Sequence, residues 1–230
     1  MSQTSILAER APEGTGIPQD RTGQSMTGTQ DLTSVLVSRI CHDLVSPVGA
    51  VVNGVDLVRE IGGGDVEAEL AMISQSSKRA SALLQYYRIA FGAASDDSEI
   101  SRNALHEQAS AFLTSPRILL DWTTDNGPHL SRPLAKLLLQ MLLCAKGLSG
   151  MRGMLSVQMS ASETLPMGVT IESDGGPETS EMLACLNGGS SSTNISPRLV
   201  EFALTRATAE AFGLQLKLTH KPGRISITVA

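Results

Sequence analysis

Hydrophobic residues recur at alternating intervals of four and three along two long stretches of the chain, separated by Gly62-Gly63-Gly64. This spacing is typical of the contact face of helices that pack side by side. It predicts one helix from about Gln30 to the glycines and another from about Val66 to Phe91, joined as an antiparallel hairpin. The expected contact positions on the first helix are Val37, Cys41, Leu44, Val48, Val51, Val55 and Val58. Those on the second helix are Leu70, Ile73, Ser77, Ala80, Leu84, Tyr87 and Phe91.

Further apolar side chains flank these contact faces and would stay uncovered in a single hairpin. They are Leu36, Ile40, Val52 and Leu57 on the first helix and Leu83 on the second. A second copy of the hairpin would cover them by completing a four-helix bundle across a twofold axis. The C-terminal part of the same chain could cover them instead. The pattern favours the homodimer and leaves this alternative open.

The pattern changes after a polar hinge at residues 93–98, beyond which helical and strand-like segments alternate. The last two strands, separated by His220-Lys221-Pro222-Gly223, are predicted to form a terminal hairpin. This order of elements is typical of an α+β domain with one mixed sheet and helices on one face. The expected helices are Arg102–Leu113, Pro133–Gly147 and Pro197–Phe212. The expected strands are Arg117–Trp122, Met154–Ser160, Gly168–Glu172, Leu214–Thr219 and Arg224–Val229.

The chain therefore divides into three regions. Residues 1–29 are rich in Gly, Ser, Thr and Gln and show no hydrophobic period, so we expect a disordered tail. Residues 30–93 are predicted to form the helical hairpin, and residues 99–230 the α+β domain.

Net charge, the length of apolar runs and cysteine spacing argue against several classes of partner and cofactor. A formal net charge of −5 with no clustered basic residues argues against nucleic-acid binding. No segment approaches the ~18 consecutive apolar residues of a membrane helix, so we expect no membrane association. Cys41, Cys144 and Cys185 are isolated from one another and from any metal-ligand spacing. This predicts reduced thiols, no metal site and a cytoplasmic protein.

His42 falls in the middle of the first helix, one position away from the contact face. Ser38, His42, Ser46, Gly49 and Asn53 follow one another at helical intervals, so they would share a narrow stripe of small polar side chains. An imidazole on such a stripe is accessible to another protein, and at neutral pH it is largely uncharged and nucleophilic. Taken alone, a lone histidine of this kind is more often an ordinary half-exposed surface residue.

The residues after His42 change that balance, because they resemble the H-box of two-component histidine kinases. The box consists of a His, an acidic residue, Leu, any residue, Ser or Thr, Pro and an aliphatic residue. His42-Asp43-Leu44 and Ser46-Pro47-Val48 match it. A Pro inside a long helix costs about 3 kcal/mol, so Pro47 is difficult to attribute to chance. The resemblance implies that His42 accepts a phosphoryl group.

Two charged residues lie beside His42 in the sequence. Arg39 would contact the transferring phosphoryl group or an acidic rim on a partner, or else it is a solvated surface charge. Asp43 resembles the acidic neighbour that assists phosphohistidine chemistry in the kinases. Adjacent residues on a helix point about 100° apart, so direct contact between Asp43 and His42 would need a bent rotamer.

The C-terminal region resembles the ATP-binding domain of histidine kinases in its order of elements, but its nucleotide motifs are incomplete. At the positions of the two N-box asparagines the chain has Gln140 and Cys144, and a neutral thiol is a poor ligand for Mg²⁺. The adenine-contacting box is reduced to Glu172–Pro177 with broken spacing, and Asn187–Ser192 lacks the glycine pattern of an ATP lid. The sequence therefore predicts a domain that does not bind ATP.

An intact H-box hairpin followed by an eroded kinase domain resembles the ChpT family, the histidine phosphotransferases of alphaproteobacterial cell-cycle phosphorelays. The most particular segments are Arg39–Ala50 with Asn53-Gly54, and Leu84–Ala93 on the second helix. The resemblance implies an α+β fold in which a dimeric four-helix bundle precedes a degenerate histidine-kinase ATPase-like domain of the Bergerat type. It also implies a homodimer with a phosphorylatable histidine in each copy.

The resemblance further implies a set of partners and site residues. Phosphate would come from the receiver of a CckA-like hybrid histidine kinase and pass to CtrA-like and CpdR-like response regulators. The receiver would bring Mg²⁺, and the chain would need no cofactor of its own. His42 would be the phospho-acceptor, bordered by Arg39, Asp43, Ser46 and Asn53, with Tyr87 and Arg88 from the second helix and Leu44 and Val45 as an apolar receiver-docking patch. Tyr87 has an equally good interpretation as a core residue, since it lies on the contact face.

Two other functions stay open at this point. A divergent histidine kinase would still use ATP, which Gln140 and Cys144 argue against. A pure interaction module would never be phosphorylated on His42, which the H-box context makes improbable.

Overall fold

The computed structural model describes residues 27–61, 64–93, 98–122, 127–161, 164–173, 179–189 and 195–229. The predicted tail at residues 1–29 lies outside the described residues except for its last three, which begin the first helix. Gly62 and Gly63 of the predicted turn, and residues 94–97 of the predicted hinge, also lie outside them.

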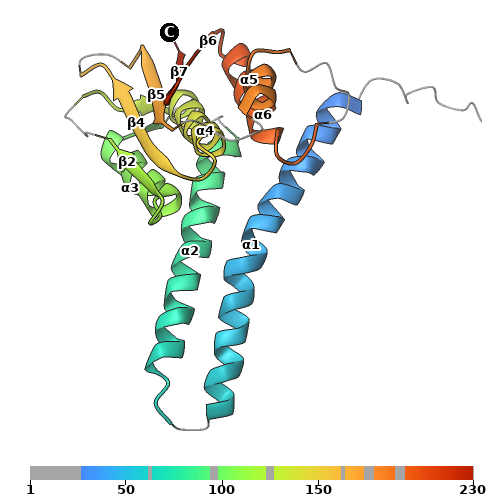
Figure 1. Cartoon of the computed structure of the whole chain (residues 1–230), viewed down its shortest axis with the longest axis vertical. Helices are drawn as coiled ribbons and strands as arrows, with labels where there is room; N and C mark the ends of the chain where they lie inside the picture. The colour runs from blue at the N-terminus through green and yellow to red at the C-terminus, as the bar shows by residue number, and fades with distance from the viewer. Residues whose placement is uncertain are drawn as a thin grey trace, which may run out of the picture.

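The N-terminal half is a long antiparallel hairpin of α1 (Thr27–Ile61) and α2 (Glu67–Phe91), which extends as a stalk from the rest of the molecule (Figure 1). Asp65 and the acidic residues Glu67 and Glu69 favour the start of α2, because carboxylates interact well with the exposed N–H groups of a first turn. At Gly54 the two helices come so close that an added Cβ would lie 2.6 Å from Cγ1 of Ile73.

The face of α1 that turns inward is rotated from the predicted contact face. Val37 and Val48 were expected at the contact, but their side chains are 53% and 49% exposed. Leu36 and Ile40, expected at the flank, are instead partly buried. On α2, Leu83 is buried and the predicted contact residue Leu84 is 52% exposed. The contact-face prediction is wrong at these positions because both sides of each helix are apolar, and spacing alone does not say which side meets the neighbour.

The C-terminal half is an α+β domain, as predicted. Its five-stranded sheet has the order β2–β4–β5–β7–β6, in which β2 (Ile118–Asp121) runs parallel to β4 (Gly153–Met159) and the remaining neighbours are antiparallel. The other strands are β5 (Met167–Glu172), β6 (Leu216–Lys221) and β7 (Arg224–Val229). A separate two-stranded ribbon pairs β1 (Glu99–Ile100) with β3 (Leu130–Ser131). The predicted terminal hairpin is present, with Gly223 at a φ of 71° in its turn.

The helices of this domain are α3 (Arg102–Leu113), α4 (Arg132–Leu148), α5 (Thr179–Leu186) and α6 (Val200–Ala211). α3 occupies the predicted residues, and α6 begins three residues later than predicted. The pattern missed α5, which has only eight residues, and the ribbon strands, which have two each. Elements this short show too little of a period to be recognised.

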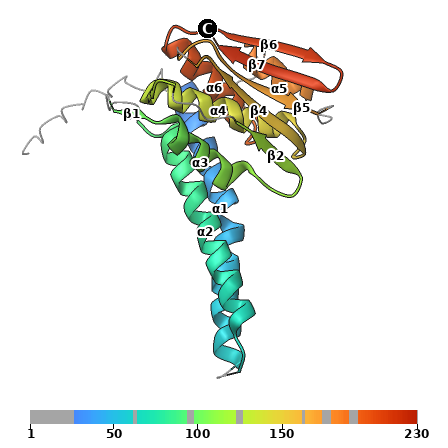
Figure 2. The same ribbon diagram turned by 90° about the vertical axis from the view of Figure 1, so that its left-hand side faces the viewer.

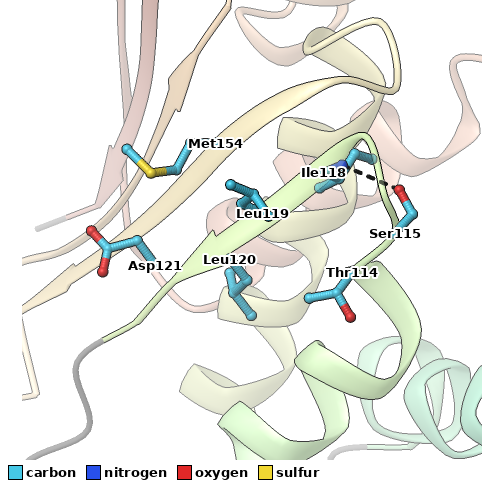
Figure 3. A pocket seen from close by; sticks show the side chains of 7 residues that line it. All are labelled: Thr114, Ser115, Ile118, Leu119, Leu120, Asp121 and Met154. Carbon is cyan, nitrogen blue, oxygen red and sulfur yellow. Dashed lines mark hydrogen bonds between the residues drawn. The ribbon is translucent and has the colours of Figure 1, made fainter.

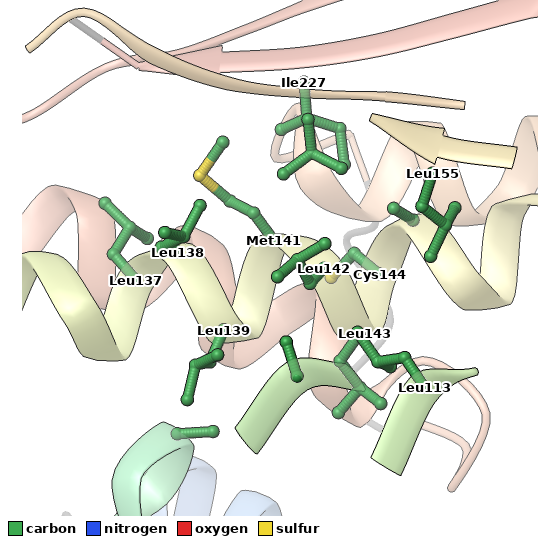
Figure 4. Close-up of a cluster of buried hydrophobic side chains, with 14 of the residues drawn as sticks. Leu113, Leu137, Leu138, Leu139, Met141, Leu142, Leu143, Cys144, Leu155 and Ile227 are labelled. Carbon is green, nitrogen blue, oxygen red and sulfur yellow. The ribbon is translucent and has the colours of Figure 1, made fainter. Parts of the chain in front are cut away.

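α4 is the centre of the core and is apolar on nearly every side. Its residues contact the sheet on one side, through Leu155 of β4 and Ile227 of β7, and Leu113 of α3 on the other (Figure 4). The end of α2 packs against the same helix (Figure 2). There the Tyr86 hydroxyl donates to the Leu139 carbonyl at 2.6 Å. A helix that is hydrophobic all round is stable only when enclosed in this way. The hairpin and the α+β domain therefore share one core.

α1 corrects one further prediction. By length and composition alone, its segment Leu32–Ile61 is long and apolar enough to cross a membrane, whereas no such segment was expected. The difference arises because Gly, Ala and Ser interrupt the apolar run without making the segment strongly polar. One such helix, identified by length and composition alone, is weak evidence for a membrane span.

Candidate functional site around His42

His42 lies on the solvent side of α1, where its side chain is 80% exposed. The predicted polar stripe is present in the structure: Ser38, Ser46 and Asn53 are exposed and Gly49 is half-buried. α1 places no large side chain next to the imidazole on this stripe. Another protein can therefore approach the ring closely.

Asp43 contacts His42 directly, although the two residues are neighbours on the helix. Oδ1 of Asp43 lies 3.3 Å from Nδ1 of His42. An ionised carboxylate only accepts hydrogen bonds, so this contact favours the tautomer with the proton on Nδ1. The lone pair of the neutral ring is then on Nε2, which is the atom available to a partner. The direct contact that the sequence made conditional on a bent rotamer is therefore present.

The Asp43 carboxylate is held by two residues besides His42. The Tyr87 hydroxyl of α2 donates to Oδ2 at 2.7 Å. Nη1 of Arg39, one turn earlier on α1, lies 3.4 Å from Oδ1. Tyr87 is buried, and burial together with the hydrogen bond to Asp43 raises the pKa of its hydroxyl far above the ordinary value. Tyr87 therefore keeps its proton and acts as a permanent donor. Tyr87 is a core residue, and its hydroxyl contacts the carboxylate next to His42.

The remaining predicted site residues occupy different surroundings. Val45 is 70% exposed, so it is available to a partner, whereas Leu44 is half-buried and packs against the core. Leu44 is therefore not part of a free apolar patch. Asn53 and Arg88 are exposed and line no cavity with His42 among the described residues.

A pocket of about 270 Å³ opens beside His42, between the hairpin and the α+β domain. Ser46 and Pro47 line it from α1, Leu83 from α2 and Phe112 from α3. Its ionisable lining residues are Arg39, His42, Asp43, Arg79, Lys146 and Glu201. Three side chains in this set are basic and two are acidic, apart from His42 itself. The site is therefore built by both halves of the chain.

Lys146 and Glu201 bring charge into the buried wall of this pocket. Nζ of Lys146 lies 4.4 Å above the centre of the Phe112 ring, a cation–π contact. Burial lowers the Lys146 pKa to about 8, with Arg79 as the next contribution. Burial raises the pKa of Glu201 to about 7, which Arg39 opposes. Glu201 is 6% exposed, and its Oε2 has no hydrogen-bond partner among the described residues.

No pattern in the sequence places Arg79, Lys146 and Glu201 beside His42. They come from α2, α4 and α6, and no local motif joins them. One weak signal existed: Lys146 and Glu201 are charged residues within helices that are otherwise strongly apolar on their inner faces. Lys and Glu are rarely buried unless they are paired or functional.

Gln140 and Cys144, at the positions that correspond to the N-box, both point into the protein core. Nε2 of Gln140 donates to the Ala90 carbonyl at 2.6 Å, which ties α4 to the end of α2. Sγ of Cys144 lies 3.1 Å from the Thr205 hydroxyl, and burial raises the pKa of the thiol well above its ordinary value. These two side chains connect helices and are not presented to a ligand. Across the described residues no group of three or more His, Cys, Asp or Glu could hold a metal ion.

A second cavity lies along β2 and carries little chemistry. It is an open groove between the end of α3 and β4, lined by Leu119, Leu120, Met154 and Asp121 among others (Figure 3). Asp121 is its only ionisable lining residue. The pocket beside His42 is the richer candidate because it combines an exposed histidine with several charged groups.

Comparisons with known proteins indicate the family to which the chain belongs. Residues 102–224 match the model of a family described as "Histidine phosphotransferase C-terminal domain". The protein phosphotransferase ChpT of Brucella abortus (strain 2308) is 41% identical over 139 residues, which cover 59% of this chain and 64% of that protein. The match thus spans a little under two thirds of the length of that relative.

Two solved structures are similar to this chain to different degrees. A bacterial phosphotransferase has a TM-score of 0.70 and 28% identity over 87% of this chain and 96% of its own. The histidine kinase AdeS of Acinetobacter baumannii has a TM-score of 0.43 and 16% identity over 82% of this chain and 95% of its own.

Proposed function

This chain belongs to the histidine phosphotransferase family, and on that premise we propose that it carries a phosphoryl group on His42 between receiver domains of a phosphorelay. The observation that carries the proposal is the chain of contacts from Tyr87 and Arg39 through Asp43 to Nδ1 of an exposed His42. It orients the ring and directs Nε2 to the solvent, where a receiver can dock.

The transfer step follows from this geometry. The Nε2 lone pair attacks the phosphorus of a receiver aspartyl-phosphate, the P–O bond to the aspartate breaks, and the aspartate leaves as a carboxylate. The proton on Nδ1 stays in place, and the positive charge that develops on the ring lies beside the Asp43 carboxylate. Transfer to a second receiver reverses these steps. Because phosphoryl transfer needs mainly alignment and charge neutralisation, an oriented imidazole is a sufficient contribution from this chain.

Receiver domains are the partners that suit this surface. Val45, 70% exposed and three residues beyond His42, offers an apolar contact next to the nucleophile. We propose a CckA-like hybrid kinase receiver as the donor and CtrA-like and CpdR-like regulators as acceptors. The Mg²⁺ would be brought by the receiver. We further propose that the protein works in the cytoplasm without contact with nucleic acid or membrane.

A second copy of the chain is the proposed cover for the exposed side of the hairpin. Val37, Cys41, Val48 and Val52 follow at helical spacing on α1 and are all exposed. This apolar stripe lies between the inward face of α1 and the polar stripe that carries His42. A helix pair from another copy would bury it and complete a four-helix bundle, leaving the polar stripe accessible.

The proposed activity excludes use of ATP. Burial of Gln140 and Cys144 supports this, because the two positions that would contact Mg²⁺ and phosphates in a kinase are engaged with Ala90 and Thr205. A divergent kinase is therefore the less favoured function.

A labelling experiment with two phosphate sources tests the proposal. The purified protein is mixed with a ³²P-labelled phospho-receiver in one reaction and with [γ-³²P]ATP and Mg²⁺ in another, each alongside His42→Ala. We expect acid-labile label on the wild-type protein from the receiver alone and none on His42→Ala. Label taken from ATP would identify a kinase, and no label from either source would identify an interaction module.

A further inference from the structure

The pocket beside His42 contains charged residues that the transfer step does not require. Transfer between proteins needs an accessible Nε2 and the support of Asp43, and both are present without Arg79, Lys146 or Glu201. Yet these three residues, from three different helices, converge on the same cavity. Bringing a lysine and a glutamate into a buried wall is costly unless some other charge compensates for it.

The pocket has three basic and two acidic side chains, so its acidic residues do not balance its cations. In the described part of the chain, no carboxylate lies within ion-pair distance of Arg79 or Lys146, and the contact of Lys146 is with the Phe112 ring. Arg39 forms an ion pair with Asp43, and the Asp43 carboxylate also accepts a hydrogen bond from the Tyr87 hydroxyl. The pocket therefore retains positive charge that suits an anion.

Glu201 gives a second and independent indication of a missing ligand. Its Oε2 is buried without a hydrogen-bond partner among the described residues, which is unusual for a carboxyl group in a native structure. When Glu201 is protonated, one of its two carboxyl oxygens carries the proton and can donate a hydrogen bond. An anion in the pocket would favour this protonated form. A buried carboxyl with an unused donor next to two unpaired cations is suited to an oxyanion.

We propose that this pocket is a binding site for a phosphate-class oxyanion, and that its occupant is the phosphoryl group carried on His42. The inference rests on the proposed function, because it requires His42 to be phosphorylated. His42 itself lines the pocket. Its side chain is 80% exposed, and occupancy of the pocket requires the ring to leave its contact with Asp43 and turn inward. The outward orientation serves transfer. The inward orientation places the phosphoryl oxygens near Lys146, Arg79 and the Glu201 carboxyl.

The size of the cavity is compatible with this occupant. About 270 Å³ corresponds to roughly nine times the ~30 Å³ share of one water molecule in the liquid, enough for a phosphoryl group and several waters. Held there, the group has part of its charge neutralised and part of its surface shielded from attacking water. The consequence is a longer-lived phosphohistidine between receiver encounters.

The test uses the full chain phosphorylated without a receiver. Potassium phosphoramidate donates the group: its P–N bond breaks, ammonia leaves, and the bond between Nε2 of His42 and phosphorus forms. Wild type is compared with Lys146→Met and Arg79→Gln, which remove one cation each from different helices. Lys146→Arg keeps the charge, and Lys78→Met removes an exposed lysine next to Arg79 as a matched control. Thermal unfolding identifies any variant that does not fold.

Two readouts follow the bound group. The half-life of phospho-His42 at pH 7.5 is expected to fall at least threefold in Lys146→Met and Arg79→Gln, and to stay within a factor of two in Lys146→Arg and Lys78→Met. A ³¹P NMR pH titration should show a higher second pKa of the phosphoryl group in Lys146→Met and Arg79→Gln, which each lack one cation, than in wild type. If folded, fully labelled Lys146→Met and Arg79→Gln show unchanged half-lives and titrations, the pocket does not bind the phosphoryl group of His42. The proposed function would be unaffected by that result.

A parallel arm separates the bound phosphoryl group from free phosphate. Inorganic phosphate is titrated into unphosphorylated wild type and Lys146→Met and followed by ³¹P line broadening. Broadening that depends on Lys146, combined with an unchanged phospho-His42 half-life, would assign the pocket to a free anion and refute occupancy by the carried group. If no donor labels His42 in the wild-type protein, the proposed function itself fails.

Discussion

The Tyr87 hydroxyl of α2 donates to Oδ2 of Asp43 on α1, so the residue next to His42 is fixed by the opposite helix of the hairpin. The bond is 2.7 Å long and partly buried. Tyr87 and His42 thus act on the two ends of one carboxylate. The orientation of the nucleophile depends in this way on the packing of the hairpin as well as on the local helix.

Replacing Tyr87 by Phe tests this dependence. We expect Tyr87→Phe to lower the free energy of unfolding by about 1 kcal/mol and to slow phosphoryl acceptance about tenfold, because Asp43 loses a donor. Stopped-flow or quench-flow transfer from a phospho-receiver and urea unfolding measure the two effects. Tyr86→Phe is the matched control: it removes a buried hydroxyl that donates to the Leu139 carbonyl, so stability should fall without a change in transfer rate. A Tyr87→Phe protein with the wild-type rate would show that Asp43 does not need its support.

Replacing Asp43 by Asn keeps the shape of the side chain and removes its charge. The developing positive charge on the ring then has no counter-charge, and the preferred tautomer is no longer enforced. We expect phosphoryl acceptance to slow by about 10²-fold, within the usual range for proton-handling groups. The rate is measured under single-turnover conditions with excess phospho-receiver. Binding of the unphosphorylated receiver, measured by calorimetry, should change little. A loss of binding equal to the loss of rate would instead make Asp43 a docking residue.

Gly54 marks the closest approach of the two hairpin helices. A Cβ at this position would lie 2.6 Å from Cγ1 of Ile73, so Gly54→Ala is expected to destabilise the protein by about 1–3 kcal/mol through overpacking. Gly49 is the contrasting position, because an added Cβ there meets no heavy atom of the described residues within 4 Å. Gly49→Ala should stabilise α1 by up to about 1 kcal/mol through helix propensity. Denaturant unfolding of the two variants side by side checks the prediction, and equal effects would contradict the tight packing at Gly54.

The Glu201 carboxyl makes stability depend on pH. Burial raises its pKa from the ordinary 4.5 to about 7, so the folded protein binds a proton that the unfolded chain releases within this window. Protonated Glu201 contributes up to about 3 kcal/mol to the free energy of unfolding. This contribution is fully present below about pH 4.5 and is lost as the pH rises through about 7. Glu201→Gln should remove this part of the slope. Lys146 acts with the opposite sign at higher pH, because its pKa is lowered to about 8 from 10.5.

Urea unfolding at several pH values between 5 and 8 provides the measurement for Glu201. The difference between wild type and Glu201→Gln isolates this group from the other carboxyls. A constant difference across the range would mean that Glu201 is ionised in the folded protein throughout.

The exposed apolar stripe on α1 predicts the oligomeric state. Val48→Glu together with Val52→Glu places two charges on the proposed dimer contact, and we expect the double variant to sediment as a monomer while the wild type sediments as a dimer. Leu119→Glu, on the exposed edge strand β2 and 63% exposed, is the control that should leave the dimer intact. Wild-type protein that sediments as a monomer at micromolar concentration would refute the dimer.

The polar stripe around His42 follows from helical spacing, whereas its surroundings do not. The contact between His42 and Asp43 depends on a rotamer that spacing does not determine. The contact face of α1 is predicted on the wrong side at Val37 and Val48, because a helix with apolar residues on two sides gives no sign of which side faces which neighbour. The order of helices and strands in the α+β domain is largely predictable because each long element has a clear period.

The rest of the site is not predictable from the sequence for a physical reason. Arg79, Lys146 and Glu201 converge through tertiary packing of α2, α4 and α6, which no local pattern encodes. The buried roles of Gln140 and Cys144 likewise depend on the docking of α4 against α2 and α6. The H-box resemblance singles out His42 as the proposed phospho-acceptor, and only the fold shows what surrounds it.

A two-step relay with isolated intermediates tests the central claim most directly. The wild-type protein is labelled from a ³²P-phospho-receiver, separated from the donor, and mixed with a second, unlabelled receiver and Mg²⁺. We predict that label leaves His42 and appears on the aspartate of the second receiver within seconds to minutes, and that His42→Ala supports neither step. Label that never enters the protein, or that enters and is released only as inorganic phosphate, would contradict a carrier of phosphoryl groups between receivers.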